Sequence, residues 1–274
     1  METTERLRAT SESARLDAEL LIARAIDMPR AYLFAHPEDV LDEAAIERLE
    51  QTVVRRLSGE PMAYISGIKE FWSLELMVSP ATLVPRPETE LLVDLALGGI
   101  PRKADWHVLD LGTGSGAIAL AIARDRPLCD IVAVDVSTEA LAVAAQNARN
   151  LSIPNVEFIE GDWTRPVADR RFKVIVSNPP YVREGDQFLE SLQAEPDVAL
   201  VPGPAGLEAI ETIARDCVPI IEAGGRLFLE HGADQRDEVA SVLSSYGWES
   251  IQCYDDFAGL PRVTSADFPS SETS

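Results

Sequence analysis

Residues 108–117 read VLDLGTGSGA: an apolar run, a turn with glycine at 112, 114 and 116, and the start of a helix. Glycine tolerates the left-handed backbone of a tight turn and lets a ligand lie directly against the main chain. Asp135 closes the next predicted strand about 20 residues later, where a carboxylate accepts hydrogen bonds from ribose hydroxyls. The stretch therefore predicts a nucleoside-binding turn. Its spacing, Gly112-x-Gly114-x-x-Ala117, also fits the motif of dinucleotide-binding proteins, in which alanine is accepted at the last position.

Strands and helices alternate on both sides of this turn. The apolar runs that predict strands cover residues 106–111, 130–136, 155–160, 172–177 and 225–231. The amphipathic stretches that predict helices cover residues 115–124, 138–150 and 206–222, followed by a helix at 234–246 and strands at 248–254 and 261–265. Apolar strands joined by helices indicate an α/β, Rossmann-like domain with a mainly parallel sheet and helices on both faces.

The residues before this domain predict a small helical region. Ser11 can cap a helix that runs to about Ile26, in which Leu16, Leu20 and Ala23 share one face. A second amphipathic helix covers residues 43–57 and ends before Ser58-Gly59 and Pro61.

A β-hairpin is expected between the two regions. Residues 71–78 and 81–84 predict short strands around Ser79-Pro80. The domain boundaries that follow are a helical domain at 1–68, a hairpin linker at 69–84 and the Rossmann-like domain at 85–274.

Composition narrows the classes of partner. The 274 residues include 24 Lys and Arg against 46 Asp and Glu, a formal charge of −22. Such a chain repels a phosphate backbone, so a basic protein is a better partner than DNA. We found no apolar run near the roughly 20 residues that span a bilayer, and no secretion signal. Three widely spaced cysteines suit a reducing compartment, so we expect a cytoplasmic protein. No feature of the sequence calls for a membrane or for an assembly larger than a monomer.

The end of the third predicted strand refines the choice of ligand. Residues 160–163 read EGDW. An acidic side chain such as Asp162 can accept the adenine amino group, and the Trp163 ring can lie on the adenine face. Acidic residues at two neighbouring strand ends suit S-adenosylmethionine, which carries no phosphate, better than a dinucleotide.

The motif Asn178-Pro-Pro-Tyr181 follows the buried strand 172–177. Two prolines fix the backbone and remove two N–H donors. The Asn178 side-chain oxygen and the Pro179 carbonyl can therefore accept both hydrogens of one planar NH2 group, while Tyr181 supplies a flat apolar face. An amide nitrogen is a weak nucleophile, so orientation toward a sulfonium methyl supplies most of the acceleration, with no metal required.

The sequence resembles the glutamine N5-methyltransferases of class I peptide chain release factors (the HemK/PrmC type). The resemblance covers nearly the whole chain. Besides the segments already described, the stretches that carry it are 17–21 (DAELL), 56–67 (RLSGEPMAYISG), 84–90 (VPRPETE), Glu195-Pro196 and 259–262 (GLPR). A departure lies at Val201–Gly206, where Ala205 stands in place of an acidic residue, which puts the substrate role of that loop in question.

The resemblance implies a class I S-adenosylmethionine-dependent fold and, as the acceptor, the glutamine amide of a Gly-Gly-Gln loop in a release factor. By this correspondence the catalytic residues are Asn178, Pro179 and Tyr181. The residues expected to bind S-adenosylmethionine are Gly112, Thr113, Gly114, Ser115, Gly116, Asp135, Asp162, Trp163 and Asn178. The residues expected to contact the acceptor are Asn178, Pro179, Pro180, Tyr181, Arg86 and Glu88.

Three alternatives stay open at this point. An Asn-Pro-Pro-Tyr site orients any planar NH2, so an adenine-specific (N6) nucleic-acid methyltransferase fits it equally well. A non-catalytic S-adenosylmethionine-binding module and a nicotinamide oxidoreductase are the others, although the second leaves Asn178–Tyr181 unexplained. Arg86 and Glu88 also have a purely structural interpretation, as the start of a helix at Pro87.

Overall fold

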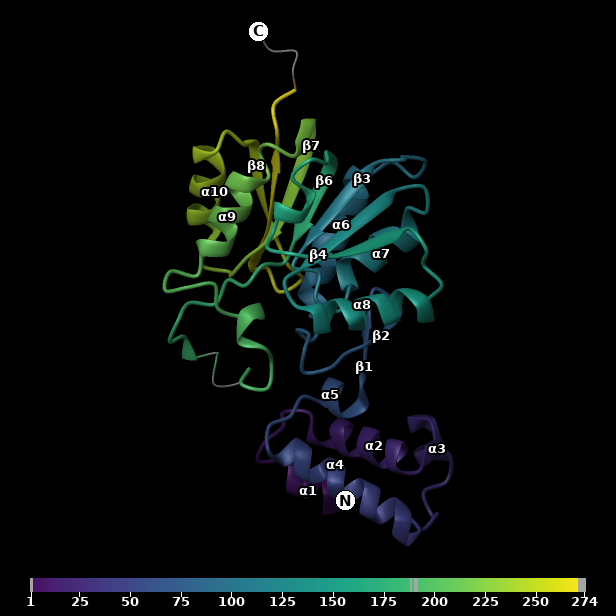
Figure 1. The fold of residues 1–274 in the computed structure, drawn as a ribbon. Coiled ribbons are helices and arrows are strands. Elements are labelled where there is room, and N and C mark those ends of the chain that lie inside the picture. Colours follow the sequence, from purple (N-terminus) through teal and green to yellow (C-terminus); the bar gives the residue numbers. More distant parts are fainter. Residues whose placement is uncertain (1, 188, 190–191, 271–274) are drawn as a thin grey trace. The chain divides into compact units, whose positions relative to one another are not determined.

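The computed structural model describes residues 2–187, 189 and 192–270 (Figure 1). The chain divides into two compact units, Met1–Ile68 and Lys69–Ser274.

The first unit is helical. Its helices are α1 (Glu2–Leu7), α2 (Ala14–Ala25), α3 (Arg30–Ala35), α4 (Glu43–Leu57) and α5 (Met62–Ser66). Their core contains Leu7, Leu21, Leu49, Val53 and Ile65.

The buried face of α2 differs from the prediction. Leu16 and Leu20 are 42% and 39% exposed, whereas Leu21 is fully buried. The helix carries a second apolar stripe, in which Ala14, Ala18, Leu21 and Ala25 follow the i, i+4, i+7, i+11 pattern. Small alanines let a neighbouring helix approach closely, so this stripe is the one that packs.

The start of α2 was also predicted wrongly. The helix begins after Ser13 rather than Ser11. The Ser11 hydroxyl instead donates to the buried Asp17 carboxylate at 2.7 Å, and Arg56 Nε donates to the same oxygen at 2.8 Å.

The hairpin lies a few residues earlier than predicted. Strands β1 (Ile68–Phe71) and β2 (Leu74–Met77) are joined by Trp72 and Ser73, whose φ angles of 53° and 55° are left-handed. Two left-handed residues match the twist of a two-residue hairpin. Because neither residue is the Gly or Asn typical of such turns, the sequence did not reveal it.

A seven-stranded sheet forms the centre of the second unit. Its strands are β3 (His107–Leu111), β4 (Asp130–Asp135), β5 (Val156–Glu160), β6 (Phe172–Ser177), β7 (Ile221–Glu230), β8 (Glu249–Asp255) and β9 (Pro261–Asp267). Their spatial order is β5-β4-β3-β6-β7-β9-β8. Strands β3 to β7 pair in parallel, while β9 runs antiparallel between β7 and β8. The predicted α/β class is confirmed.

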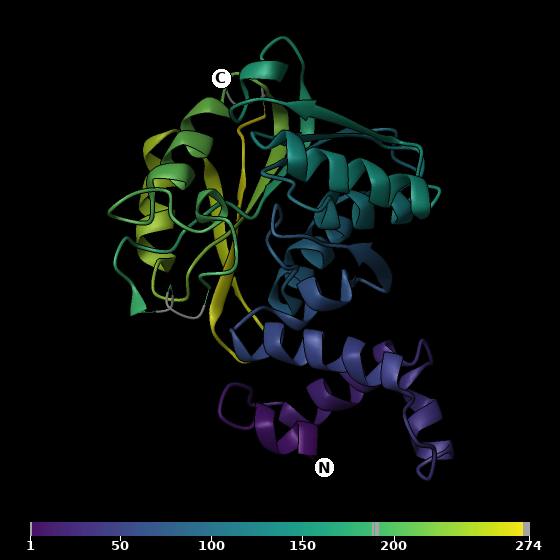
Figure 2. The ribbon, with the colours of Figure 1, turned by 60° about the horizontal axis from the view of Figure 1, so that its bottom comes forward.

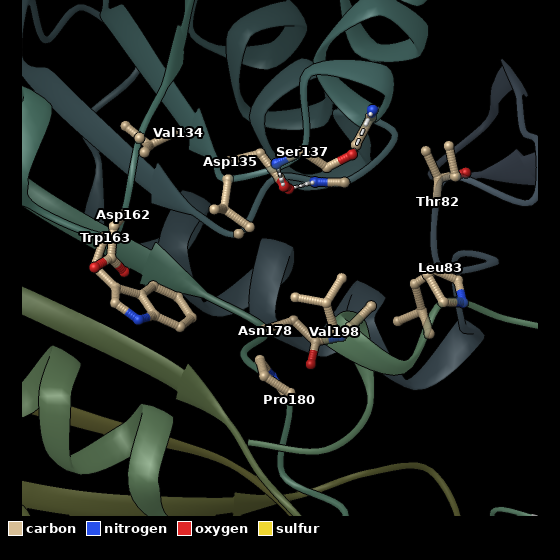
Figure 3. A pocket seen from close by; sticks show the side chains of 18 residues that line it. Thr82, Leu83, Val134, Asp135, Ser137, Asp162, Trp163, Asn178, Pro180 and Val198 are labelled. Atoms are coloured by element: carbon tan, nitrogen blue, oxygen red, sulfur yellow. Dashed lines mark hydrogen bonds between the residues drawn. The ribbon is translucent and has the colours of Figure 1, made fainter. Parts of the chain in front are cut away.

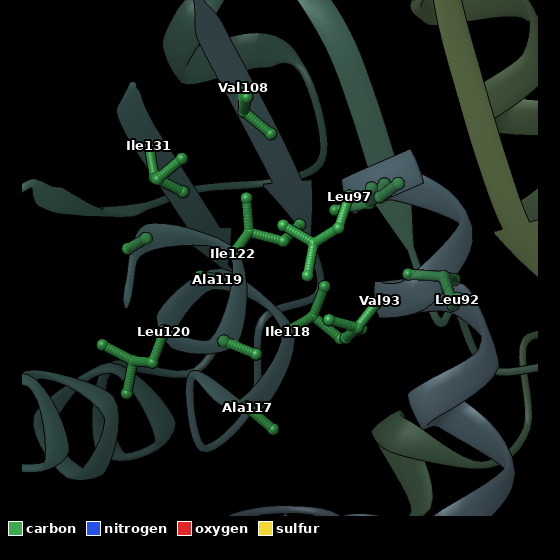
Figure 4. Close-up of a cluster of buried hydrophobic side chains, with 14 of the residues drawn as sticks. Leu92, Val93, Leu97, Val108, Ala117, Ile118, Ala119, Leu120, Ile122 and Ile131 are labelled. Carbon is green, nitrogen blue, oxygen red and sulfur yellow. The ribbon is translucent and has the colours of Figure 1, made fainter. Parts of the chain in front are cut away.

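Helices cover both faces of this sheet (Figures 1 and 2). The helices of the second unit are α6 (Glu90–Gly99), α7 (Ala117–Asp125), α8 (Thr138–Asn150), α9 (Glu208–Asp216) and α10 (Arg236–Ser245). Leucines and valines of α6 and nearly every residue of α7 pack on β3 and β4 in one core cluster (Figure 4). α9 and α10 pack on the opposite side chains of the same strands in a second cluster.

Most boundaries in this unit match the prediction within a few residues. The predicted helix 206–222 is the main exception, because α9 ends at Asp216 and β7 begins at Ile221. A turn of 3-10 helix at Pro87–Thr89 leads into α6. Among the described residues, no helix combines the length and the apolar character needed to cross a membrane.

Candidate active site

A cavity of about 290 Å³ lies at the carboxyl ends of the parallel strands (Figure 3). The strands end together there, since Leu111 pairs with Ser177 and Asp135 with Glu160. The cavity is lined by Ala81, Thr82, Leu83, Gly112, Gly114, Val134, Asp135, Val136, Ser137, Ala140, Gly161, Asp162, Trp163, Asn178, Pro180, Pro196, Val198 and Ala199.

The glycine turn presents bare backbone to this cavity. Gly112 and Gly114 have φ angles of 72° and 57°, which favour glycine. A Cβ added at Gly114 would meet no atom within 4 Å, so the main chain there faces open space.

Asp135 holds the turn from the neighbouring strand. One carboxylate oxygen accepts a hydrogen bond from Gly114 N at 2.8 Å, and the other accepts one from Ser137 N at 2.9 Å. Each oxygen has a further lone pair. The carboxylate can therefore fix the turn and still accept hydrogen bonds from a ligand.

Asp110, on β3, supports the same turn. It is fully buried, and one oxygen accepts from the Thr113 hydroxyl at 2.7 Å and from Ala119 N at 3.2 Å. Its Oδ1 has no hydrogen-bond partner among the described residues. Burial raises the pKa of Asp110 to about 7, although these two hydrogen bonds favour the charged form.

Three predicted ligand residues of the turn lie outside the cavity lining. Thr113 is buried against Asp110. Ser115 is buried, and its carbonyl accepts a hydrogen bond from Asn147. Gly116 directly precedes α7, and a Cβ there would lie 3.1 Å from the Cβ of Ala144. These three residues therefore serve the shape of the turn rather than its open face.

The third strand end brings Asp162 and Trp163 to the cavity. The left-handed φ of 50° at Trp163 turns the chain at this point. The indole lies beside the glycine turn, 3.7 Å from the position of a Cβ on Gly112. Asp162 pairs with Arg165 at 2.9 Å and is half exposed.

Asn178 lies across the cavity from Asp135, directly after β6 (Figure 3). Its Nδ2 donates to the Thr89 hydroxyl at 3.2 Å. Its Oδ1 takes no part in this hydrogen bond. The Ser177 hydroxyl donates to Leu111 O at 2.7 Å and ties the end of β6 to β3. Pro180 lines the cavity, whereas Pro179 is buried and is not among the lining residues.

Tyr181 is turned toward the sheet rather than into the cavity lining. Its hydroxyl donates to the Glu230 carboxylate at 3.2 Å. Burial raises the pKa of Glu230 to about 6, against Thr89, Arg262 and Tyr181, which favour its charged form. Burial and the Glu230 charge also raise the pKa of Tyr181.

The two acceptor-contact residues from the 84–90 segment lie apart from the lining. Arg86 forms an ion pair with the buried Glu195, which also accepts from Val84 N at 3.0 Å. Glu88 is exposed. Residues 196–199, which follow Glu195, contribute to the cavity wall, and so do residues 81–83, which precede Val84. The contacts of Glu195 with Val84 and Arg86 therefore hold these two wall segments together.

The loop Val201–Gly206, which differs from the family pattern at Ala205, packs against the Asn178–Tyr181 turn. This packing needs no acidic residue at position 205. Gln235 is buried, and its Nε2 donates to the carbonyls of Tyr181 and Gly206, both at 3.1 Å. A Cβ on Gly206 would lie 2.7 Å from the Tyr181 carbonyl oxygen. Glycine is therefore required at this close approach. Ala205 acts through its backbone, since its N–H donates to Glu208 and its carbonyl accepts from Arg183 Nε at 3.3 Å.

Sequence reasoning missed much of the cavity wall. The missed lining residues are Ala81, Thr82, Leu83, Val134, Val136, Ser137, Ala140, Gly161, Pro196, Val198 and Ala199. Val136 and Ser137 directly follow Asp135 and could have been found from that position. The segments 81–83 and 196–199 adjoin or overlap two stretches that carry the resemblance, 84–90 and Glu195-Pro196, but no residue pattern within them indicates that they line a cavity.

One exposed group of described residues, His36, Glu38 and Asp39, brings possible metal-ligand atoms together. It belongs to the first unit, and exposed acidic groups are common without a metal. The absence of a metal requirement stays a prediction.

Comparison with known proteins agrees with the two units. Residues 1–67 match the model of the PrmC N-terminal domain, and residues 89–201 match that of the methyltransferase small domain. The release factor glutamine methyltransferase of Coxiella burnetii is 44% identical over 260 residues, which are 95% of this chain and 94% of that protein. The enzyme of the same name from Escherichia coli K12 is 41% identical over 93% of this chain and 92% of its own length.

The fold also has solved counterparts. A methyltransferase from Pyrococcus furiosus superposes with a TM-score of 0.56 at 19% identity, over 81% of this chain and 99% of that one. Identity at this level supports the fold alone.

Proposed function

The chain belongs to the family of release factor glutamine methyltransferases, and we propose that it methylates the side-chain amide nitrogen of the glutamine in the Gly-Gly-Gln motif of class I peptide chain release factors. The identity to relatives of that name over nearly the full length of both chains carries the family. The placement of Asn178 across one cavity from Asp135 is the observation that carries the chemistry. Such a reaction belongs where translation takes place, so we expect the protein in the cytoplasm.

The cavity fits S-adenosylmethionine. Gly112 and Gly114 offer backbone without side chains, Asp135 offers a carboxylate with lone pairs to spare, and Trp163 offers an aromatic ring. When bound, this compound supplies an electrophilic methyl group on a sulfonium. We assign the ribose to Asp135 and the adenine to Asp162 and Trp163.

Asn178 and Pro179 orient the acceptor in this proposal. The Asn178 amide donates to Thr89, which directs its oxygen away from that contact and toward an incoming NH2 group. The Pro179 carbonyl is the second acceptor. Two fixed acceptors would hold the amide nitrogen in line and favour the positive charge that develops on it. The new N–C bond would form as the S–C bond of the sulfonium breaks, S-adenosylhomocysteine would leave as the neutral thioether, and the amide nitrogen would release one proton to water.

Tyr181 shapes this turn through its contact with Glu230, and Pro180 contributes cavity wall. Arg86 acts through Glu195 rather than by direct contact with the acceptor. The helical unit is assigned to docking of the folded protein substrate, and the net charge of −22 favours a basic partner over DNA. A monomer satisfies these roles.

The test is methyl transfer from labelled S-adenosylmethionine to a purified class I release factor. Parallel reactions contain the factor with the Gly-Gly-Gln glutamine replaced by alanine, and an adenine-containing DNA. Label on the wild-type factor alone is expected. Label on DNA would move the function to an adenine methyltransferase, and label on neither would leave a binding module.

A further inference from the structure

Asn147, on α8, stands out among the buried polar side chains of the second unit. It is fully buried, although asparagine is a poor helix-interior residue and its amide is expensive to bury without hydrogen bonds. It is not among the residues that line the cavity.

The Asn147 amide uses every donor it has. Its Oδ1 accepts from Met77 N at 2.7 Å, and its Nδ2 donates to Met77 O at 3.0 Å and to Ser115 O at 2.9 Å. Met77 thus has its N–H and its C=O bound by one side chain, as a neighbouring strand would bind them. Three satisfied contacts compensate the burial of the amide.

Neither partner lines the cavity, but each adjoins a segment that does. Ser115 lies in the glycine turn, one residue after Gly114, which lines the cavity. Met77 ends β2, and the chain continues from it into the lining residues 81–83. One buried side chain therefore connects the glycine turn to the end of β2, from which the chain enters the second lining segment, 81–83.

Packing on the same helix supports this connection. Gly116 approaches Ala144 so closely that a Cβ would lie 3.1 Å from it, and Ala144 precedes Asn147 by three residues on α8. α8 thus fixes the glycine turn by contact at Gly116 and by a hydrogen bond at Ser115.

We infer that Asn147 is a positioning residue for methyl transfer: it sets the distance between the glycine turn and the segment 78–83, and through it the fit of S-adenosylmethionine. The inference rests on the proposed function for its substrate. Its effect on the binding of S-adenosylmethionine is independent of which acceptor is methylated.

Asn147→Asp tests this inference at nearly constant volume. The aspartate keeps an acceptor for Met77 N, loses both donors and turns an oxygen toward the carbonyls of Met77 and Ser115. We expect the dissociation constant of S-adenosylmethionine, measured by calorimetry, to rise tenfold or more, and kcat to fall at saturating donor.

Asn155 provides a matched control in the same unit. Its Nδ2 donates to the carbonyls of Ala123, Arg126 and Cys129 at 3.2, 3.4 and 3.0 Å, before the amino end of β5 and away from the cavity lining. Asn155→Asp removes an equivalent loop-binding amide, so the melting temperature is expected to fall while the dissociation constant and kcat stay within about twofold.

Both variants are compared well below their measured melting temperatures. If Asn147→Asp does not fold, Asn147→Ala, which introduces no repulsion, is measured instead. An unchanged dissociation constant in the Asn147 variant, or equal changes in both asparagine variants, would overturn the inference. Failure of wild-type protein to methylate a release factor while it binds S-adenosylmethionine would overturn the proposed function and leave this binding result interpretable.

Discussion

The two sides of the cavity are built from contacts of very different range. On the donor side, Asp110–Gly116 with Asp135, the hydrogen bonds join residues 3 and 21 positions apart. On the acceptor side, Asn178–Tyr181 with Thr89 and Glu230, they join residues 89 and 49 positions apart. The donor side is thus built mainly from contacts of short range, to which Asn147 on α8 adds a bond to Ser115 over 32 positions. The acceptor side depends on segments from across the domain.

The two sides also share one feature. Each contains a buried carboxyl group with one oxygen that has no hydrogen-bond partner among the described residues, Asp110 on the donor side and Glu230 on the acceptor side. Substitutions on each side can be tested for their separate effects on the binding of S-adenosylmethionine and on the rate of methyl transfer. The results will show whether the donor and acceptor sides also have separate functions.

The largest effect is expected at Asn178. Asn178→Ala removes one of the two proposed acceptors for the NH2 group, so kcat for methyl transfer should fall roughly 10²–10³-fold. The donor dissociation constant should change far less, because Asp135 and the glycine turn remain. Single-turnover kinetics and calorimetry measure the two quantities. Full activity in this variant would remove Asn178 from the mechanism.

A smaller effect is expected at Asp135, on donor affinity rather than on kcat. Asp135→Ala removes the proposed ribose acceptor and the support of Gly114 N, so donor affinity should fall about 10–100-fold. At saturating donor, kcat should recover most of its value. Asp130→Asn, at the other end of β4, is the control. If kcat fell as steeply as affinity, the division between the two sides would fail.

The two buried carboxyl groups predict a pH dependence of stability. Their pKa values are raised in the folded protein, so they hold a proton more tightly there than in the unfolded chain. The stability that this supplies is present at low pH and is lost as pH rises, from about 4.5 to 6 for Glu230 and from about 4 to 7 for Asp110. The loss is on the order of 2 kcal/mol for Glu230 and larger for Asp110.

Urea unfolding of wild-type protein, Asp110→Asn and Glu230→Gln across this pH range tests this expectation. Each variant should show a flatter dependence than the wild type, and Asp110→Asn the flattest. Identical slopes in all three proteins would mean that neither carboxyl titrates differently in the folded state.

The smallest effect is expected at the ion pair of Arg86 and Glu195. Arg86→Gln and Glu195→Gln should each lower kcat/KM for the release factor by about fivefold, as the loss of a partly buried pair suggests. The double variant should be no worse than Glu195→Gln alone, because Arg86 acts through Glu195. Additive losses in a double-mutant cycle would contradict this expectation and would indicate that Arg86 contacts the release factor directly.

The range of the contacts also explains what the sequence could reveal. The class of fold, most element boundaries of the second unit and the approach of Asp135 to the glycine turn follow from local patterns, and the structure contains them. The hairpin turn at Trp72-Ser73, the buried face of α2, the partners Thr89 and Glu230 and the wall segments 81–83 and 196–199 do not. Each depends on tertiary packing that overrides or lies outside any local pattern.

The order of the strands has a consequence for crowded solutions. β5 and β8 are the outer strands, and within the described part of the chain no further strand pairs with the outer edge of either. The backbone groups along such an edge can pair with those of another molecule and begin aggregation. Exposed glutamates, Glu160 on β5 and Glu249 on β8, put negative charge on both strands, and the whole chain carries −22. Like-charged edges repel, so colloidal stability should be greatest at low ionic strength and decline as salt screens the carboxylates.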